Sequence, residues 1–168
     1  MGMTPTEFFE SFVEGNAYDC RENPGCIRRA FNAAVSASHL ADHYLKFNRR
    51  HSPDLVNEFN EIGVYVEYLT NQTNGAFKDI RSIANAYKHL YTDSNKGADV
   101  HSTVNSSGSI EAISLSGDEA LSMLEEEHLR DNEKNEWVAR VIFTRKDGTR
   151  SEFLPILNAT IEYWRTVI

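Results

Sequence analysis

Apolar positions in the first half of the chain recur at alternating steps of three and four residues, the spacing of helices that bury one side. The clearest case is the segment 76–91, whose apolar stripe consists of Phe77, Ile80, Ala84, Tyr87 and Tyr91. Strong polar side chains flank this stripe. The segment therefore predicts a helix that either pairs with an acidic neighbour or presents its polar side to a ligand.

Three earlier segments show the same repeat, and each opens with a capping residue followed by proline. These openings are Thr4-Pro5, Asn23-Pro24 and Ser52-Pro53. They predict helices from residue 4 to a stop at Gly15-Asn16, from 23 to about 48, and from 52 to about 71. Because short polar links join the four segments, an up-and-down helical bundle is predicted over residues 4–93.

From residue 98 the pattern changes to alternation of apolar and polar residues, which is typical of strands. It predicts two hairpins, made of strands 100–104 with 110–115 and 137–145 with 150–154. Asp147-Gly148 marks the turn of the second hairpin. Between the hairpins, a short helix over 120–129 and an acidic connector up to residue 136 are predicted, and Pro155 begins a closing helix over 156–167.

These elements together predict an α+β fold in a single domain, residues 1–168. A four-helix bundle over 4–93 is followed, over 98–168, by a four-stranded antiparallel β-meander and a C-terminal helix. A chain of 168 residues is long enough to bury a core without a disulfide or a metal.

Charge and composition narrow the function classes. The net charge of −8 disfavours non-specific binding to duplex nucleic acid, although a local basic patch could still act on RNA. No apolar run approaches the ~18 residues of a membrane span, and the start lacks the pattern of a signal peptide. We therefore expect a soluble, cytoplasmic protein without a membrane partner. Cys20 and Cys26 are expected to be reduced thiols.

Candidate chemistry concentrates beside the apolar stripe of segment 76–91, at Arg81, Asn85, Lys88 and His89. At ~100° per residue, Arg81 and Lys88 lie within ~20° of each other on the shoulder of the stripe. Asn85 lies ~40–60° further round, and His89 is nearly opposite the centre of the stripe.

The natural facing segment is 38–43 on the second helix, which carries His39, Asp42 and His43. Asp42 lies ~60° from the centre of its apolar stripe, so it is expected to be half-buried and to need a cation. We expect a structural ion pair with Arg81 or Lys88, and a hydrogen-bonded histidine beside it. The alternative is that His39 and His43, four residues apart, bind a transition metal, with His89 or Asp42 as a further ligand. No phosphate-binding loop or nucleophile elbow occurs, and no cofactor is expected.

A helix with an arginine and a later histidine, inside a small helical bundle, is similar to the HEPN superfamily. The residues that carry this resemblance are 81–89, with 38–43 as the facing segment. Many members are metal-independent ribonucleases that act as dimers. The resemblance implies that Arg81 binds phosphate or stabilises the transition state, and that His89 is the general acid/base or positions the scissile group. Asn85 and Lys88 are further candidates for the same site.

Two functions follow from these observations. One is a non-catalytic interaction module of HEPN-like type, which binds a protein partner and could form a homodimer. The other is a metal-independent endoribonuclease that cleaves single-stranded RNA in a toxin or phage-defence role, using Arg81 and His89. Seven residues separate these two, more than in the usual motif, which puts them ~12 Å and ~80° apart on the helix. That spacing and the acidic charge favour the interaction module, whereas the density of polar side chains favours the enzyme.

Overall fold

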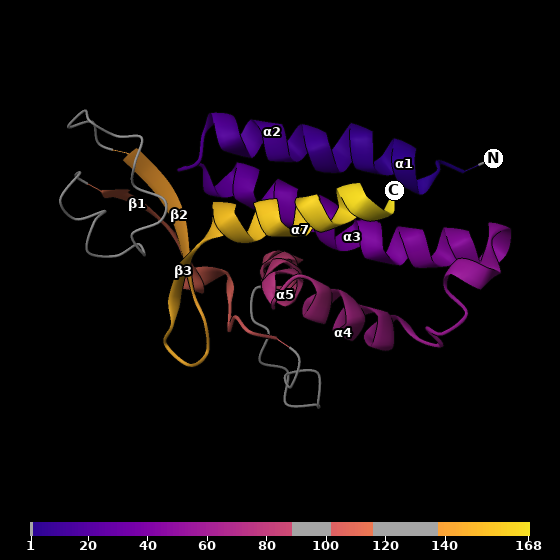
Figure 1. The fold of residues 1–168 in the computed structure, drawn as a ribbon. Coiled ribbons are helices and arrows are strands. Elements are labelled where there is room, and N and C mark those ends of the chain that lie inside the picture. The colour runs from indigo at the N-terminus through magenta and orange to yellow at the C-terminus, as the bar shows by residue number, and fades with distance from the viewer. Residues whose placement is uncertain (1, 89–101, 116–137) are drawn as a thin grey trace.

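The computed structural model describes residues 2–88, 102–115 and 138–168. The fold is α+β, with helices packed side by side and a small antiparallel sheet at one end (Figure 1). None of the described helices has the length and apolarity needed to cross a bilayer. The first predicted strand (100–104) lies partly, and the predicted helix 120–129 and the acidic connector entirely, outside the described residues.

The N-terminal helix runs without a break through α1 (Pro5–Phe8), the π-helical η1 (Phe9–Glu14) and α2 (Gly15–Glu22). The capping box that opens it is present, because Thr4 Oγ1 accepts from the Glu7 backbone N–H at 3.2 Å. The predicted stop at Gly15-Asn16 is wrong. Gly15 has ordinary right-handed helical dihedrals (φ −61°, ψ −49°), and glycine weakens a helix interior without ending it.

The link between α2 and α3 (Ile27–His51) is short and contacts the sheet. Cys20 and Cys26 flank it as free thiols, and burial raises the pKa of Cys20 to about 11. The Pro24 carbonyl accepts a hydrogen bond from the Val141 backbone N–H at 3.0 Å. A Cβ at Gly25 would lie 2.3 Å from the Ala139 Cβ, so only glycine fits this close approach.

The predicted third helix is divided into a 3₁₀ turn, η2 (Pro53–Leu55), and α4 (Ile62–Gln72). The single helix predicted from residue 52 is therefore wrong over 56–61. The Arg49 side chain supplies the reason, because its Nη2 donates to the carbonyls of Phe59 (2.8 Å) and Asn60 (2.7 Å). These carbonyls are satisfied by a side chain instead of by a helical turn. The fourth predicted helix is α5 (Ala76–Lys88), and its predicted end at 89–91 lies outside the described residues.

The sheet has the order β1-β2-β3, with β1 (Ile110–Leu115), β2 (Val138–Thr144) and β3 (Arg150–Glu152) all antiparallel. The predicted four-stranded meander is thus a three-stranded sheet in the part of the chain that is described. β1 pairs with β2, with Ile110 opposite Phe143, and not with residues 102–104, the described part of the predicted strand 100–104. Residues 102–104 do not form a strand, because Thr103 is bonded to α5 and to the β2–β3 turn instead.

The second predicted hairpin is present. Gly148 in its turn has φ 86°, and the Thr149 backbone N–H donates to Asp147 Oδ1 at 2.9 Å. After β3, helix α7 (Phe153–Val167) begins at Phe153, three residues before the predicted start. Pro155 therefore lies in the first turn of α7, where the missing N–H has no helical partner to lose.

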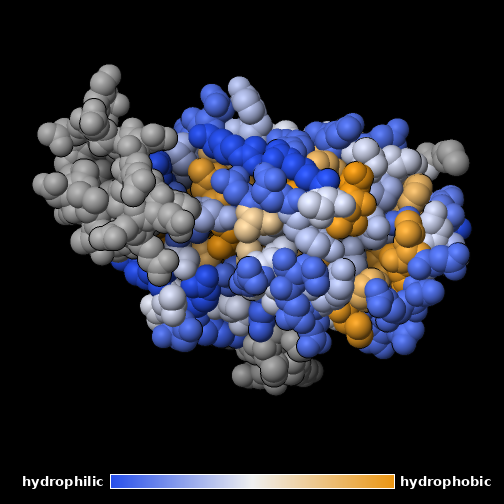
Figure 2. All heavy atoms as spheres, in the orientation of Figure 1, coloured by the Kyte–Doolittle hydropathy of each residue, from blue (hydrophilic) through white to orange (hydrophobic). Residues whose placement is uncertain are grey.

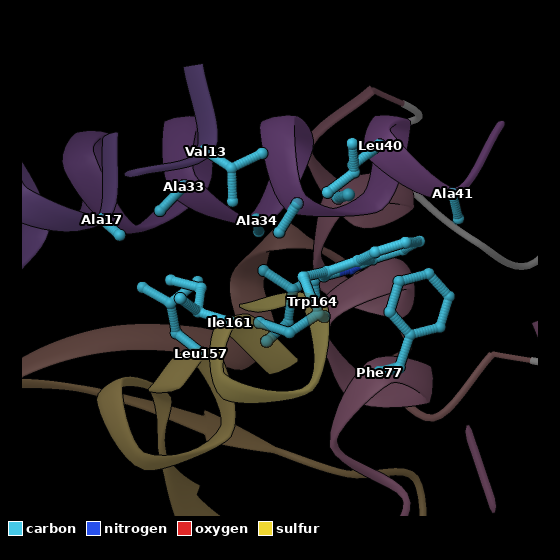
Figure 3. Close-up of a cluster of buried hydrophobic side chains, with 14 of the residues drawn as sticks. Val13, Ala17, Ala33, Ala34, Leu40, Ala41, Phe77, Leu157, Ile161 and Trp164 are labelled. Atoms are coloured by element: carbon cyan, nitrogen blue, oxygen red, sulfur yellow. The ribbon is translucent and has the colours of Figure 1, made fainter. Parts of the chain in front are cut away.

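Helix α7 lies at the centre of the core and not at its edge. Its residues Leu157, Ile161 and Trp164 are fully buried. Figure 3 shows them facing Val13 and Ala17 of the N-terminal helix, Ala33, Ala34, Leu40 and Ala41 of α3, and Phe77 of α5. The alanines of α3 allow this close packing, so the last helix completes the helical layer that the first four segments were predicted to form alone.

Candidate functional site

Helices α3 and α5 form the frame of the candidate site. Phe31 stacks on Tyr87, His39 contacts Lys88, and Asp42 contacts Arg81. The last two contacts bring polar residues of both helices together on a shared side.

The polar residues of α5 occupy one narrow sector of that helix. At ~100° per residue, Lys78, Arg81, Asn85 and Lys88 fall within ~80°, and all four are exposed or half-buried. On α3, His39, Asp42 and Lys46 fall within ~60° and face the same way. We call these seven residues the α3/α5 polar face: His39, Asp42, Lys46, Lys78, Arg81, Asn85 and Lys88.

The predicted ion pair at Asp42 is present, and its partner is Arg81. Arg81 Nη1 lies 3.2 Å from Asp42 Oδ2, and the two side chains are 26% and 32% exposed. This is a single contact between half-exposed groups, which typically stabilises a protein by about 0–1 kcal/mol. The pair therefore connects the two helices without being a large term in the stability of the fold.

Lys88 contacts His39 and not the carboxylate. Lys88 Nζ lies 2.6 Å from His39 Nε2, and since an ammonium group can only donate, the imidazole nitrogen must accept. Partial burial and the charge of Lys88 lower the pKa of His39 below its ordinary value; Arg81 acts in the same direction and Asp42 opposes it. His39 is therefore neutral near pH 7, with its proton on Nδ1.

The two histidines proposed as metal ligands have different partners. The His43 ring stacks on Phe8 with centroids 5.0 Å apart, and its Nε2 donates to the Met3 carbonyl at 2.8 Å. No group of three His, Cys, Asp or Glu residues converges within ranges 2–88, 102–115 and 138–168. His89 lies outside those ranges, so its role stays a prediction.

A second ion pair on α5 was not foreseen from the sequence. Asp79 is only 4% exposed, and Arg145 of the β2–β3 turn contacts both of its carboxylate oxygens, at 2.6 and 3.1 Å. Thr103 Oγ1 donates to Asp79 Oδ1 at 2.7 Å, and Arg145 Nη1 donates to Ser151 Oγ at 2.6 Å. This network fixes α5 to the hairpin. The available signal was an aspartate in the apolar sector of the helix, between the directions of Ile83 and Ala86.

Charge is distributed very unevenly along the chain. Helices α3 and α5 carry eight Lys or Arg residues and two Asp residues, a net charge of 8 − 2 = +6 in a chain whose total is −8. Residues 116–137 alone contain eight Asp or Glu and two Lys or Arg, a net charge of −6. The α3/α5 polar face contains four of these eight cations and one of the two carboxylates, so it is basic although the chain as a whole is acidic.

In comparisons with known proteins, no family model matches the chain, and no curated protein or solved structure matches it significantly.

Proposed function

We propose that this protein is a non-catalytic interaction module of HEPN-like type, which binds a partner macromolecule through its α3/α5 polar face. The observation that carries the proposal is the pairing across the two helices. Arg81 is held by Asp42, and Lys88 is held by His39. Side chains that are already fixed lose less conformational entropy when a partner binds, so such a face suits recognition.

An exposed aromatic side chain at the C-terminal end of α5 supports the same proposal. Tyr87 is 54% exposed, and its ring stacks on Phe31 with centroids 4.7 Å apart. Tyrosine and arginine are enriched among the residues that contribute most to protein–protein binding. A tyrosine held against α3 can therefore serve as a further anchor at this end of α5, ~100° round the helix from Lys88.

Acid–base catalysis at the described residues of this face has little chemical support. A general base needs a lone pair within reach of the proton it removes. The Nε2 lone pair of His39 is occupied by the ammonium group of Lys88, and the Asp42 carboxylate is engaged by Arg81. These contacts favour a binding role over a catalytic one for His39, Asp42, Arg81 and Lys88.

The second candidate is the metal-independent endoribonuclease, with Arg81 and His89 as its catalytic residues and a homodimer as its active form. The four cations of the α3/α5 polar face, opposed by the single carboxylate of Asp42, favour this candidate, because a basic face can hold the phosphates of an RNA strand. Arg81 is half-exposed and could exchange Asp42 for a phosphate group.

Incubation with labelled single-stranded RNA in the presence of EDTA separates the two candidates. We expect no cleavage by the wild-type protein. Cleavage that is lost in both Arg81→Ala and His89→Ala, and kept in Lys146→Ala on the β2–β3 turn, would establish the ribonuclease instead. Loss of an acid–base group costs typically 10²–10⁴-fold in rate, so a time course would reveal it. Activity that requires added Mn²⁺ or Zn²⁺ would contradict both candidates and would point to His39 and His43.

A further inference from the structure

We infer that the α3/α5 polar face binds an acidic polypeptide segment in preference to a nucleic acid strand. This inference rests on the binding function proposed above and adds the chemical class of the partner. Three features of the face support it: its positive net charge, the spacing of its cations, and its mixture of hydrogen-bond donors and acceptors.

The sign of the charge indicates an acidic partner. Lys46, Lys78, Arg81 and Lys88 oppose one carboxylate, Asp42, so the face carries 4 − 1 = +3 when His39 is neutral. The other carboxylate of α5, Asp79, is buried against Arg145 and does not reduce this charge at the surface. Complementary charge steers association and sets the orientation of a partner.

The spacing of the cations suits a short peptide. Ten residues of helix separate Lys78 from Lys88, a distance of ~15 Å along α5. On the neighbouring helix α3, Asp42 contacts Arg81 and His39 contacts Lys88, so both helices contribute side chains to this row. A partner helix of about ten residues, with carboxylates one turn apart along one side, would match this row.

The mixture of donors and acceptors favours a polypeptide over a nucleic acid. Asp42 places a carboxylate in the middle of the cationic row, and Asn85 adds an amide that both donates and accepts. Phosphate oxygens only accept hydrogen bonds, and the negative charge of Asp42 repels them. A helical peptide can place carboxylates opposite the cations and side-chain amide or hydroxyl donors opposite Asp42, whereas a phosphate backbone presents only acceptors to this row.

The test measures fluorescence anisotropy with three labelled probes on the full-length protein. The first is a helical peptide of about 16 residues with glutamates every three or four positions. The second has glutamine at each of those positions, and the third is a single-stranded RNA of matching charge. We expect the glutamate peptide to bind, the glutamine peptide to bind at least about tenfold more weakly, and the RNA to bind more weakly than the glutamate peptide. Binding should weaken at about 150 mM salt, where surface charges are screened beyond ~8 Å.

Matched variants assign the binding to the face. Lys78→Gln and Lys88→Gln should each weaken binding of the glutamate peptide by about twofold to fivefold, as expected for one exposed charge contact. Lys146→Gln, on the exposed β2–β3 turn, should leave it unchanged. Circular dichroism of each variant checks that the fold is intact.

Three outcomes would overturn the inference. They are the absence of glutamate-peptide binding, binding that is insensitive to Lys78 and Lys88, and RNA binding as tight as or tighter than peptide binding through the same lysines. Failure here is distinct from failure of the proposed function. Metal-independent RNA cleavage would refute the interaction module. A protein that neither cleaves RNA nor binds the glutamate peptide would refute only the inference that the partner is an acidic polypeptide.

Discussion

Two residues of helix α5, Asp79 and Arg81, form ion pairs on different sides of the helix. Asp79 is buried and pairs with Arg145. Thr103 adds a hydrogen bond to Asp79, and Ser151 adds one to Arg145. Arg81 meets Asp42 through one contact in half-exposed surroundings. An aspartate and an arginine thus form a buried ion pair on one side of the helix and a partly exposed ion pair on the other. Burial and the number of hydrogen bonds, and not the identity of the residues, separate a structural pair from one that a ligand can reach.

The largest expected effect comes from breaking the buried pair. Arg145→Ala leaves the Asp79 carboxylate buried without its cation, which should lower the free energy of unfolding by about 3–5 kcal/mol. Chemical denaturation measures this loss. The control is Arg150→Ala on the same hairpin, whose pair with Glu111 is exposed and should contribute under about 1 kcal/mol. Equal losses in the two variants would remove the contrast between the pairs.

A smaller effect is expected for the exposed pair. Asp42→Ala should lower the free energy of unfolding by under about 1 kcal/mol, because Arg81 stays solvated at 26% side-chain exposure. Denaturation in urea, run beside Arg145→Ala, gives the comparison directly. A loss above about 2 kcal/mol would mean that the pair is structural and would weaken the assignment of the α3/α5 polar face to binding.

The smallest expected effect is a pH dependence at His39. Its folded-state pKa lies below its ordinary value, because partial burial and Lys88 disfavour the charged ring. As the pH falls below the unfolded pKa of about 6.5, the unfolded chain binds this proton first, so the free energy of unfolding decreases. His39→Gln should flatten this part of the pH profile. In NMR titrations the His39 pKa should rise when Lys88 is replaced by glutamine, and an unchanged value would contradict the contact.

Local pattern was sufficient to predict the features that depend on near neighbours. Three such features are the buried residues Phe77, Ile80 and Ala84 of the α5 stripe, the capping box at Thr4 and the Asp147-Gly148 turn. Tyr87 of the same predicted stripe is 54% exposed, and Tyr91 lies outside the described residues. The pairing of Asp42 with Arg81 was also accessible, because helical geometry sets how deeply each residue lies on its own helix.

Features that depend on distant residues could not be predicted in this way. The side chain of Arg49 interrupts the predicted third helix by binding two carbonyls ten and eleven residues away. Thr103 is held by α5, so the strand predicted there does not form, and β1 pairs with β2 instead. The buried ion pair between Asp79 and Arg145 joins residues 66 positions apart. Periodicity contains no information about such contacts.

Within the candidate site, the sequence identified the residues better than their partners. Lys88 was a proposed cation for Asp42, but it contacts His39 instead. This choice depends on the relative axial positions of α3 and α5, which core packing sets and helical wheels do not contain. His89 stays a prediction, to be tested by the RNA assay.

The contact between the α2–α3 link and the sheet also bears on association between copies of the chain. β3 ends at Glu152, opposite Ile142, so the Val141 N–H of β2 lies beyond the end of that ladder, where Pro24 accepts its hydrogen bond. The Pro24 carbonyl satisfies the Val141 N–H, but proline has no N–H of its own. It therefore cannot donate a hydrogen bond that would continue a β-ladder along β2. Gly25, packed against Ala139, keeps the link close to the strand. A strand from another molecule therefore finds this stretch of β2 already occupied, which protects the protein against edge-to-edge aggregation.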